Sequence, residues 1–379
     1  MKVTVSVHGR YHAFELAKGL SESGHLSQLL TTYPRFAVRK VTGAHLPIKS
    51  APLLELRRRI YGRFGWGPKP DLLIARQFAD FAANNLPESG DLLVGWSSAT
   101  LEAITPAKAR GMKVIIERGS THISHQTDVL KEAYRSCGLA FDDTDPAMVE
   151  REVQEYAAAD AISVPSAHAA RSFITRGIPE DKLLVNSLAV NLSRFHPPAT
   201  PPDNPKPRII FAGGVGVRKG VPWLLRAIGK LAGKAELHLF GQVEPSFKEQ
   251  LSAQVTDDVV VHGPVSAERL AEEYTKADIF CLPSVEEGFG LVVPQAMASG
   301  LPVIVSDAVG ASDLITPGEQ GVIVPEMDDK ALADALLNLV EDKPLRHKMG
   351  ASAVKRVQAG CSWDDYVSRA VTDYQTLLS

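Results

Sequence analysis

Short apolar segments alternate with longer amphipathic ones along almost the whole chain, and this alternation limits the fold more than any other feature. The first apolar segment, Val3–Val7, is rich in β-branched residues, and residues 14–23 follow it with helical spacing. Similar apolar runs lie at residues 92–94, 114–116, 161–164 and 183–185. Short buried strands separated by helices are typical of a parallel sheet covered on both faces. The sequence therefore predicts an α/β fold.

A proline-rich segment divides this alternation into two series. Six prolines lie between residues 197 and 207, and proline disfavours both helices and central strands. Beyond it, strands are predicted at residues 209–212, 237–240, 259–262, 279–282 and 303–306. A chain of 379 residues is longer than a single hydrophobic core usually accommodates. We therefore expect two Rossmann-like, doubly wound domains facing a central cleft. These are an N-terminal domain at 1–195, a linker at 196–206, a C-terminal domain at 207–360, and a helix at 361–379 that packs back on the first domain.

The composition excludes several classes of protein. With 41 Lys and Arg against 44 Asp and Glu, the net charge of −3 argues against a nucleic-acid-binding protein. Cys137, Cys281 and Cys361 are far apart and form no Cys-x-x-Cys motif, which predicts no zinc or haem site and a reducing compartment. No segment has the character of a signal-peptide core or a membrane span. We therefore expect a cytoplasmic protein.

A glycine-rich turn follows the first strand predicted after the linker. Glycines let a backbone approach an anion, and two adjacent cations can neutralise a diphosphate. The turn is neither a Walker A motif nor a complete dinucleotide fingerprint. By itself it therefore fits either a phosphate-binding loop or an ordinary turn with two solvated cations. Its characteristic residues are Gly213, Gly214, Gly216, Arg218 and Lys219.

A second segment, residues 283–304, places the acidic pair Glu286 and Glu287 before a Gly-Phe-Gly sequence and a short helix. Backbone N–H groups at the start of a helix offer partial positive charge to a phosphate. A carboxylate beside them suits sugar hydroxyls or a developing oxocarbenium ion. The alternative is a loop with a solvated acidic pair.

Together these two segments resemble the family 4 glycosyltransferases, which have the GT-B fold. The resemblance covers almost the whole second half, including residues 262–265, 277–280 and 313–325, and is diffuse before residue 150. It implies a retaining enzyme of polysaccharide biosynthesis that moves a hexose from a nucleotide-diphosphate sugar to a glycan, lipid-linked or small-molecule acceptor. It implies no cofactor, since the nucleotide sugar is a co-substrate. Because no DxD-like cluster lies near the cationic turn, we also expect no obligatory metal.

The resemblance assigns roles to individual residues of the second half. Lys219 binds the donor diphosphate with Arg218 beside it, and Glu287 contacts hydroxyls of the transferred sugar. Backbone groups of residues 289–291 surround the phosphate and the sugar. The donor-binding set comprises Gly213, Gly214, Gly216, Gly241, Pro264, Val265, Phe289, Gly290, Leu291 and Gln295.

Two positions depart from the family pattern. Gln295 stands where the family usually has a Glu that holds the ribose, and Gly214 stands where many members have Arg. Arg218 supplies the missing charge in that interpretation.

In the first half, the resemblance places Gly9 and Arg10 at the cleft, directly after the first strand. Arg10 contacts a phosphate or the acceptor, or it forms a structural salt bridge. Arg118 also lies at the cleft, and His122 is the candidate for a catalytic histidine. His125 is the alternative candidate, and a histidine with a purely structural hydrogen bond is the other interpretation.

Residues 35–77 form a strongly basic stretch, with ten Lys and Arg against only Glu55 and Asp71. Apolar and aromatic residues are interleaved with these cations. The stretch fits a peripheral contact with an anionic membrane and hence a lipid-linked acceptor. It also fits a solvated basic face.

Two rival functions remain compatible with the sequence. One is a nucleotide-sugar epimerase of GT-B fold, although no acid–base set for it is identifiable. The other is a non-catalytic nucleotide-sugar-binding protein, which Gln295 favours.

Overall fold

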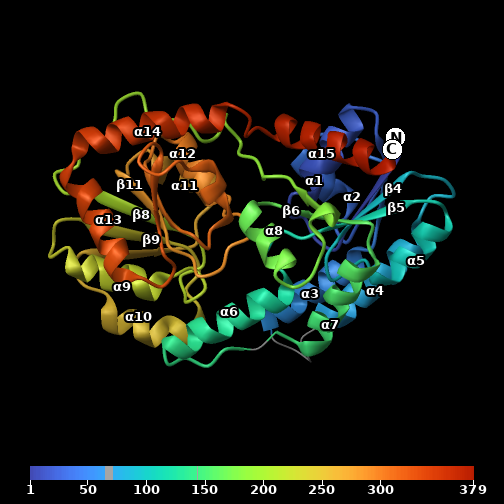
Figure 1. Ribbon diagram of the computed structural model, residues 1–379, viewed down its shortest axis with the longest axis horizontal. Helices are drawn as coiled ribbons and strands as arrows, with labels where there is room; N and C mark the ends of the chain where they lie inside the picture. The colour runs from blue at the N-terminus through green and yellow to red at the C-terminus, as the bar shows by residue number, and fades with distance from the viewer. Residues whose placement is uncertain (65–70, 143) are drawn as a thin grey trace.

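The computed structural model describes residues 1–64, 71–142 and 144–379, and it forms two halves that lie side by side (Figure 1). Each half contains a parallel sheet with helices packed against it. This confirms the predicted α/β class with two Rossmann-like domains.

In the first domain, the described strands follow the order β3-β2-β1-β4-β5-β6-β7 and all pair in parallel. All five residues of β1 and of β4 are buried, including Thr4 and Ser6 of β1, which is typical of strands covered on both faces. The strands are β1 (Val3–Val7), β2 (Leu26–Thr31), β3 (Ile48–Ser50), β4 (Leu92–Trp96), β5 (Lys113–Glu117), β6 (Ala161–Val164) and β7 (Leu183–Val185). The helices are α1 (Ala13–Glu22), α2 (Arg35–Thr42), α3 (Pro52–Phe64), α4 (Asp71–Asn85), α5 (Leu101–Ala109), α6 (Ile123–Ser136), α7 (Pro146–Ala158) and α8 (Ala167–Ile174).

In the second domain, the strands follow the order β10-β9-β8-β11-β12-β13, again parallel throughout. They are β8 (Arg208–Ala212), β9 (Glu236–Phe240), β10 (Val259–Gly263), β11 (Ile279–Leu282), β12 (Val303–Ser306) and β13 (Gly321–Val324). The helices are α9 (Val221–Lys230), α10 (Lys248–Gln254), α11 (Ala267–Tyr274), α12 (Val292–Ala298), α13 (Asp329–Glu341), α14 (Lys343–Gln358) and α15 (Trp363–Leu378). Short 3₁₀ turns occupy Glu180–Lys182, Pro245–Phe247 and Gly310–Leu314.

The strand order of each sheet reverses at one point. In the first sheet β1 lies between β2 and β4, and in the second β8 lies between β9 and β11. Ligands of open α/β sheets bind at such a switch point, outside the carboxyl ends of the strands. The loops that follow β1, β4, β8 and β11 are therefore the positions where a site is expected.

Two chain segments connect the domains. The first is the proline-rich linker, and the second runs from α14 to α15, which returns to pack on α1. Figure 1 shows the result: both termini lie in the first half, with α15 beside α1. The two connections are joined where the backbone N–H of Val190 donates to the carbonyl of Cys361 over 2.9 Å.

Across the described ranges, none of the helices combines the length and the apolar composition that a membrane span requires.

Candidate active site

The glycine-rich turn after β8 brings two cations to the switch point of the second sheet. Gly220, with φ of +71°, precedes α9, and a Cβ there would lie 1.8 Å from the carbonyl oxygen of Pro283. Only glycine permits this approach of the turn to the loop that follows β11. Arg218 and Lys219 therefore lie beside Glu286 and Glu287.

Arg218 pairs with Glu286, a side chain that is 1% exposed. Its Nε lies 2.9 Å from Oε2 of Glu286, which also accepts from Nε2 of Gln126 over 2.8 Å. The other carboxylate oxygen accepts from the hydroxyls of Ser120 and Thr121 over 2.7 and 2.8 Å. Burial by itself raises the pKa of Glu286, but Arg218 and these hydrogen bonds lower it to about 2. The acidic pair is thus not a solvated surface feature, and Glu286 connects the two domains.

Lys219 forms an ion pair with Glu287, the residue expected to contact the transferred sugar. Both side chains are largely enclosed, with exposed fractions of 19% and 12%. Burial and the positive charge of Arg218 lower the pKa of Lys219, while the carboxylate of Glu286 acts in the opposite direction. The structure therefore brings together three of the four predicted catalytic residues.

A cavity of about 360 Å³ lies between the domains, next to Arg218. Its walls come from the loops after β1, β4 and β5 of the first domain, and from Arg218 and Leu291 of the second. Four aromatic rings contribute to it: those of His8, His12, Trp96 and Tyr11, which is 59% exposed. Rings together with hydroxyl and amide groups are suited to a sugar, which presents both apolar and polar faces.

Arg118, predicted at the cleft, lines this cavity and is held by several partners. Its guanidinium lies 2.9 Å from the carboxylate of Glu152 and donates to Oε1 of Gln126 over 2.9 Å. Gly9 is buried in the loop after β1, where Thr31 donates to its carbonyl, and Arg10 is exposed on the same loop. Neither Gly9 nor Arg10 lines the cavity.

His122 does not occupy the position that the sequence suggested. It is the N-cap of α6, and its Nδ1 accepts from the backbone N–H of Ser124 over 3.1 Å. Its ring packs against Tyr156 and Phe173 in the interior, with centroid distances of 5.1 and 5.0 Å, and it does not line the cavity. Burial, with the charges of Arg176 and Arg118, lowers the pKa of His122 to about 4. The structure thus gives His122 a capping and packing position, and its catalytic role stays a prediction. His125 on the same helix does not line the cavity either.

The predicted donor-binding glycines lie where the backbones of neighbouring loops meet. A Cβ at Gly241 would lie 1.7 Å from the carbonyl oxygen of Gly213, and a Cβ at Gly216 would lie 2.1 Å from Oε2 of Glu244. Gly214 instead faces open space. Pro264 and Val265 are exposed after β10.

The remaining predicted donor residues surround the start of α12. The carbonyl of Phe289 accepts from the backbone N–H of Ala311 over 2.7 Å, so this oxygen is already used within the protein. Gly290 has φ of +88°, and Leu291 lies at the cavity. Gln295 is half-buried on α12, and its side chain forms no hydrogen bond within the described part of the chain.

Several residues of the site were not predicted to belong to it. Glu286 and His8 stand beside predicted residues in the sequence, and Gln126 lies four positions after His122. His8 lines the cavity, and burial, with Arg58 and Arg151, lowers its pKa to about 4. A neutral imidazole of this kind can accept a hydrogen bond from a ligand.

Comparisons with known proteins agree with this geometry. A sucrose-phosphate synthase from Thermosynechococcus elongatus has the same architecture, with a TM-score of 0.73 at 21% identity over 99% of this chain and 98% of that one. The Anabaena protein HepE in complex with UDP and glucose matches with a TM-score of 0.70 at 14% identity, over 99% of this chain and all of that one. The chain has the GT-B fold of glycosyltransferases.

Sequence relatives lead to the same enzyme class. Residues 206–342 match the family described as Glycosyl transferases group 1. A D-inositol 3-phosphate glycosyltransferase from Nocardia farcinica is 28% identical over 89% of this chain and 80% of that protein. Another, from Xylanimonas cellulosilytica, is 30% identical over 59% of this chain, and the match spans only 58% of that relative. The comparisons thus support the glycosyltransferase class expected from the sequence.

Proposed function

We propose that this GT-B protein is a retaining glycosyltransferase that moves a hexose from a nucleotide-diphosphate sugar to an acceptor in the cleft. One observation carries the proposal: Arg218 and Lys219 end the glycine-rich turn beside two carboxylates, at the edge of a cavity that both domains line. A diphosphate at this turn meets two cations, and an acceptor can enter from the first domain.

The ion pair of Lys219 and Glu287 leaves both side chains able to act on a donor. An ammonium group has three donors, so Lys219 can contact a phosphate oxygen while one proton remains directed at Glu287. Glu287 can in turn accept from hydroxyls of the transferred sugar. Arg218, oriented by Glu286, adds a second positive charge near the leaving group.

The proposed reaction proceeds on one face of the sugar. The acceptor oxygen bonds to the anomeric carbon as the bond from that carbon to the phosphate oxygen breaks, and the departing phosphate takes the acceptor's proton. The acceptor attacks the same face of the sugar from which the leaving group departs. The anomeric configuration is therefore retained. Arg218 and Lys219 stabilise the charge that develops on the phosphate, and this is the role that a divalent metal would otherwise fill. We therefore propose that transfer needs no added metal.

The cavity favours an uncharged sugar ring as the part of the acceptor that enters it. Arg118, the arginine that the first domain contributes to the cavity, is already paired with Glu152. A phosphate next to Arg118 would have to compete with a buried carboxylate, which costs binding energy. The rings of Tyr11 and Trp96 offer apolar surface to a sugar instead.

An exposed apolar and basic surface on α2 and α3 supports a lipid-linked acceptor. Phe36 is 75% exposed, and Leu53 and Leu56 on one face of α3 are 78% and 53% exposed. A hollow of about 650 Å³ beside them is lined by basic residues and by no carboxylate: Arg35, Arg39, His45 and Lys49. We propose that this surface, residues 35–60, contacts an anionic membrane. The predicted basic stretch continues into residues 65–70, which lie outside the described residues, as do the side chains of residues 62–64.

The transfer reaction is tested by incubating the protein with a panel of nucleotide sugars, with and without glycan acceptors. We expect nucleotide diphosphate release that depends on the acceptor, and a glycoside product whose anomeric configuration, read by NMR, matches that of the donor. Chelation should leave the rate unchanged. Release without any acceptor-derived product, an inverted product, or a metal-dependent rate would contradict the corresponding part of the proposal.

Membrane contact is tested separately by co-sedimentation with phosphatidylcholine vesicles that contain or lack phosphatidylglycerol. The protein should bind only the anionic vesicles, and Leu53→Asp with Arg39→Glu should abolish binding. Arg58 and Arg59 of the same basic stretch are not suitable targets, because both pair with Glu55. Val255→Asp, at an exposed apolar residue of the second domain, is the matched control. Failure of the unmodified protein to sediment would remove the membrane proposal without affecting the transfer proposal.

A further inference from the structure

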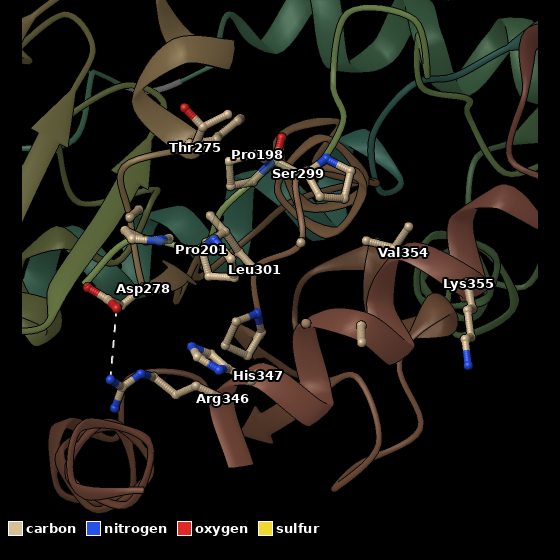
Figure 2. A pocket seen from close by; sticks show the side chains of 18 of the residues that line it. Pro198, Pro201, Thr275, Asp278, Ser299, Leu301, Arg346, His347, Val354 and Lys355 are labelled. Carbon is tan, nitrogen blue, oxygen red and sulfur yellow. Dashed lines mark ion pairs between the residues drawn. The ribbon is translucent and has the colours of Figure 1, made fainter. Parts of the chain in front are cut away.

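A second cavity, of about 480 Å³, lies outside the cleft on the second domain (Figure 2). Three parts of the second half of the chain enclose this cavity: residues 197–202 of the linker, the turns that precede β11 and β12, and one side of α14. In Figure 2, Pro201 and Leu301 lie opposite Arg346 and His347 of α14, and Lys355 lies farther along the same helix. Its size falls within the range of small-molecule sites.

The interior of this cavity is largely apolar, and its two charged side chains, Asp278 and Arg346, already have partners within the protein. One oxygen of Asp278 accepts from Nδ2 of Asn204 over 2.7 Å and from the backbone N–H of Arg208 over 2.8 Å. Arg346 donates to the carbonyls of Leu339 and Val340 over 2.7 and 2.9 Å. These groups maintain the fold. Most of the surface left for a ligand is apolar, and prolines, Leu301 and Val354 contribute to it.

The rim of the cavity is positively charged. Helix α14 carries five Lys and Arg and no Asp or Glu, and Lys355 and His347 line the cavity from it. Both side chains are exposed, and neither forms a hydrogen bond or ion pair within the described residues. The lone carboxylate among the lining residues, Asp278, is held by its three partners. An apolar interior with an uncompensated positive rim is complementary to an anion that has an apolar body.

We propose that this cavity binds a small organic anion, with its rings or alkyl part against the linker prolines and its charge at Lys355. The site is separate from the donor and acceptor sites and does not depend on the proposed reaction.

The location of the cavity predicts an effect on domain motion. The linker forms one wall, and α14, which forms another, leads directly into the second connection between the domains. Gly300 lies in the wall between the linker and α14 and is close to both segments. A Cβ at Gly300 would lie 3.4 Å from Cβ of Pro197 in the linker, and the carbonyl oxygen of Gly300 lies against Gly350 of α14. A ligand that bridges the linker and α14 therefore restricts the linker.

The probe for this site is 8-anilinonaphthalene-1-sulfonate, compared with its neutral analogue N-phenyl-1-naphthylamine. We expect the sulfonate to bind more tightly, and Ala351→Trp, which fills the cavity from α14, to remove that binding. Lys355→Glu should weaken it about fivefold, since an attraction becomes a repulsion at a solvated rim. Lys348→Trp and Lys348→Glu are the controls, because Lys348 lies on α14 but does not line the cavity.

Hydrogen exchange locates the probe. In the unmodified protein, the sulfonate should protect the amides of Ala199 and Thr200, the two linker residues of 197–202 that carry an amide hydrogen, together with residues 346–358. Neither segment should be protected in Ala351→Trp. Binding that survives Ala351→Trp would show that the cavity is not the site. Equal affinity for the neutral analogue would contradict the proposal that the ligand is an anion. Protection limited to α14 would contradict the proposal that the ligand restricts the linker.

Discussion

The side-chain amide of Gln126 donates to Oε2 of Glu286 over 2.8 Å, so a helix of the first domain holds the carboxylate that orients Arg218 in the second. Farther along the same helix, the hydroxyl of Tyr134 donates to Glu244 over 2.5 Å. Figure 1 shows α6 extending from the first half toward α10 of the second. Helix α6 thus contacts the second domain near both of its ends.

Glu286 should make domain contact sensitive to acid. Its pKa of about 2 lies below the ordinary value of 4.5, so its stabilising contribution is complete above about 4.5 and is lost as the pH falls toward 2. The melting temperature of the unmodified protein should fall more steeply over this interval than that of Glu286→Gln. Glu272→Gln, at an exposed carboxylate, should retain the steep fall. Equal slopes in all three proteins would contradict this role of Glu286.

Lys219→Ala should reduce the rate of transfer by at least about a hundredfold, because it removes a buried positive charge from beside the departing phosphate. The variant also leaves Glu287 without its counter-ion, so its melting temperature should fall too. Steady-state kinetics under conditions where the variant remains folded separate the two effects. Lys230→Ala, at the other end of α9, should transfer normally. A near-normal rate in Lys219→Ala would remove the proposed phosphate site.

Gly220→Ala should disrupt the donor loop. At φ of +71°, the added Cβ would meet the carbonyl oxygen of Pro283 at 1.8 Å, so the turn and the loop after β11 must separate. We expect a loss of donor binding by calorimetry together with a lower melting temperature. Gly229→Ala is the control, because a Cβ there meets open space within α9, and helix propensity predicts a gain of up to about 1 kcal/mol.

The sequence was informative where the pattern is local. Buried strands such as Val3–Val7 and the linker prolines follow from apolar runs and from the chemistry of proline, and the positions of Arg218, Lys219 and Glu287 follow from a contiguous motif. Because the strands of the second sheet are parallel and their order reverses at β8, the loops after β8 and β11 must lie next to each other.

Contacts between distant segments could not be predicted in the same way. Glu286 is held by Ser120, Thr121 and Gln126, about 160 positions away, and no local pattern records such a pairing. The capping contact of His122 was not predicted either, because histidine is not among the usual N-cap residues and its capping position leaves no clear signal in the sequence. Two first-domain histidines do line the cavity, but they are His8 and His12, after β1.

His122→Asn should separate the structural from the catalytic interpretation. Asparagine can still cap α6, but it cannot fill the space between Tyr156 and Phe173, so the melting temperature should fall. The rate of transfer per folded molecule should stay unchanged, because the ring does not reach the cavity. A loss of kcat larger than about tenfold with intact folding would restore a catalytic role for His122.

Gln295 is the position at which the chain departs from the glutamate expected to hold the ribose. Its side chain is half-buried on α12 and forms no hydrogen bond within the described residues, so its amide is available to a ligand. If it binds the ribose, Gln295→Ala should raise the donor KM about five- to thirtyfold, the equivalent of about 1–2 kcal/mol from lost hydrogen bonds. Gln295→Glu should keep or improve the KM, since a carboxylate accepts more strongly than an amide, unless the charge of Glu286 opposes it. A purely packing role predicts instead that both variants change the melting temperature while the donor KM stays constant, and measuring the two quantities on the same samples distinguishes these outcomes.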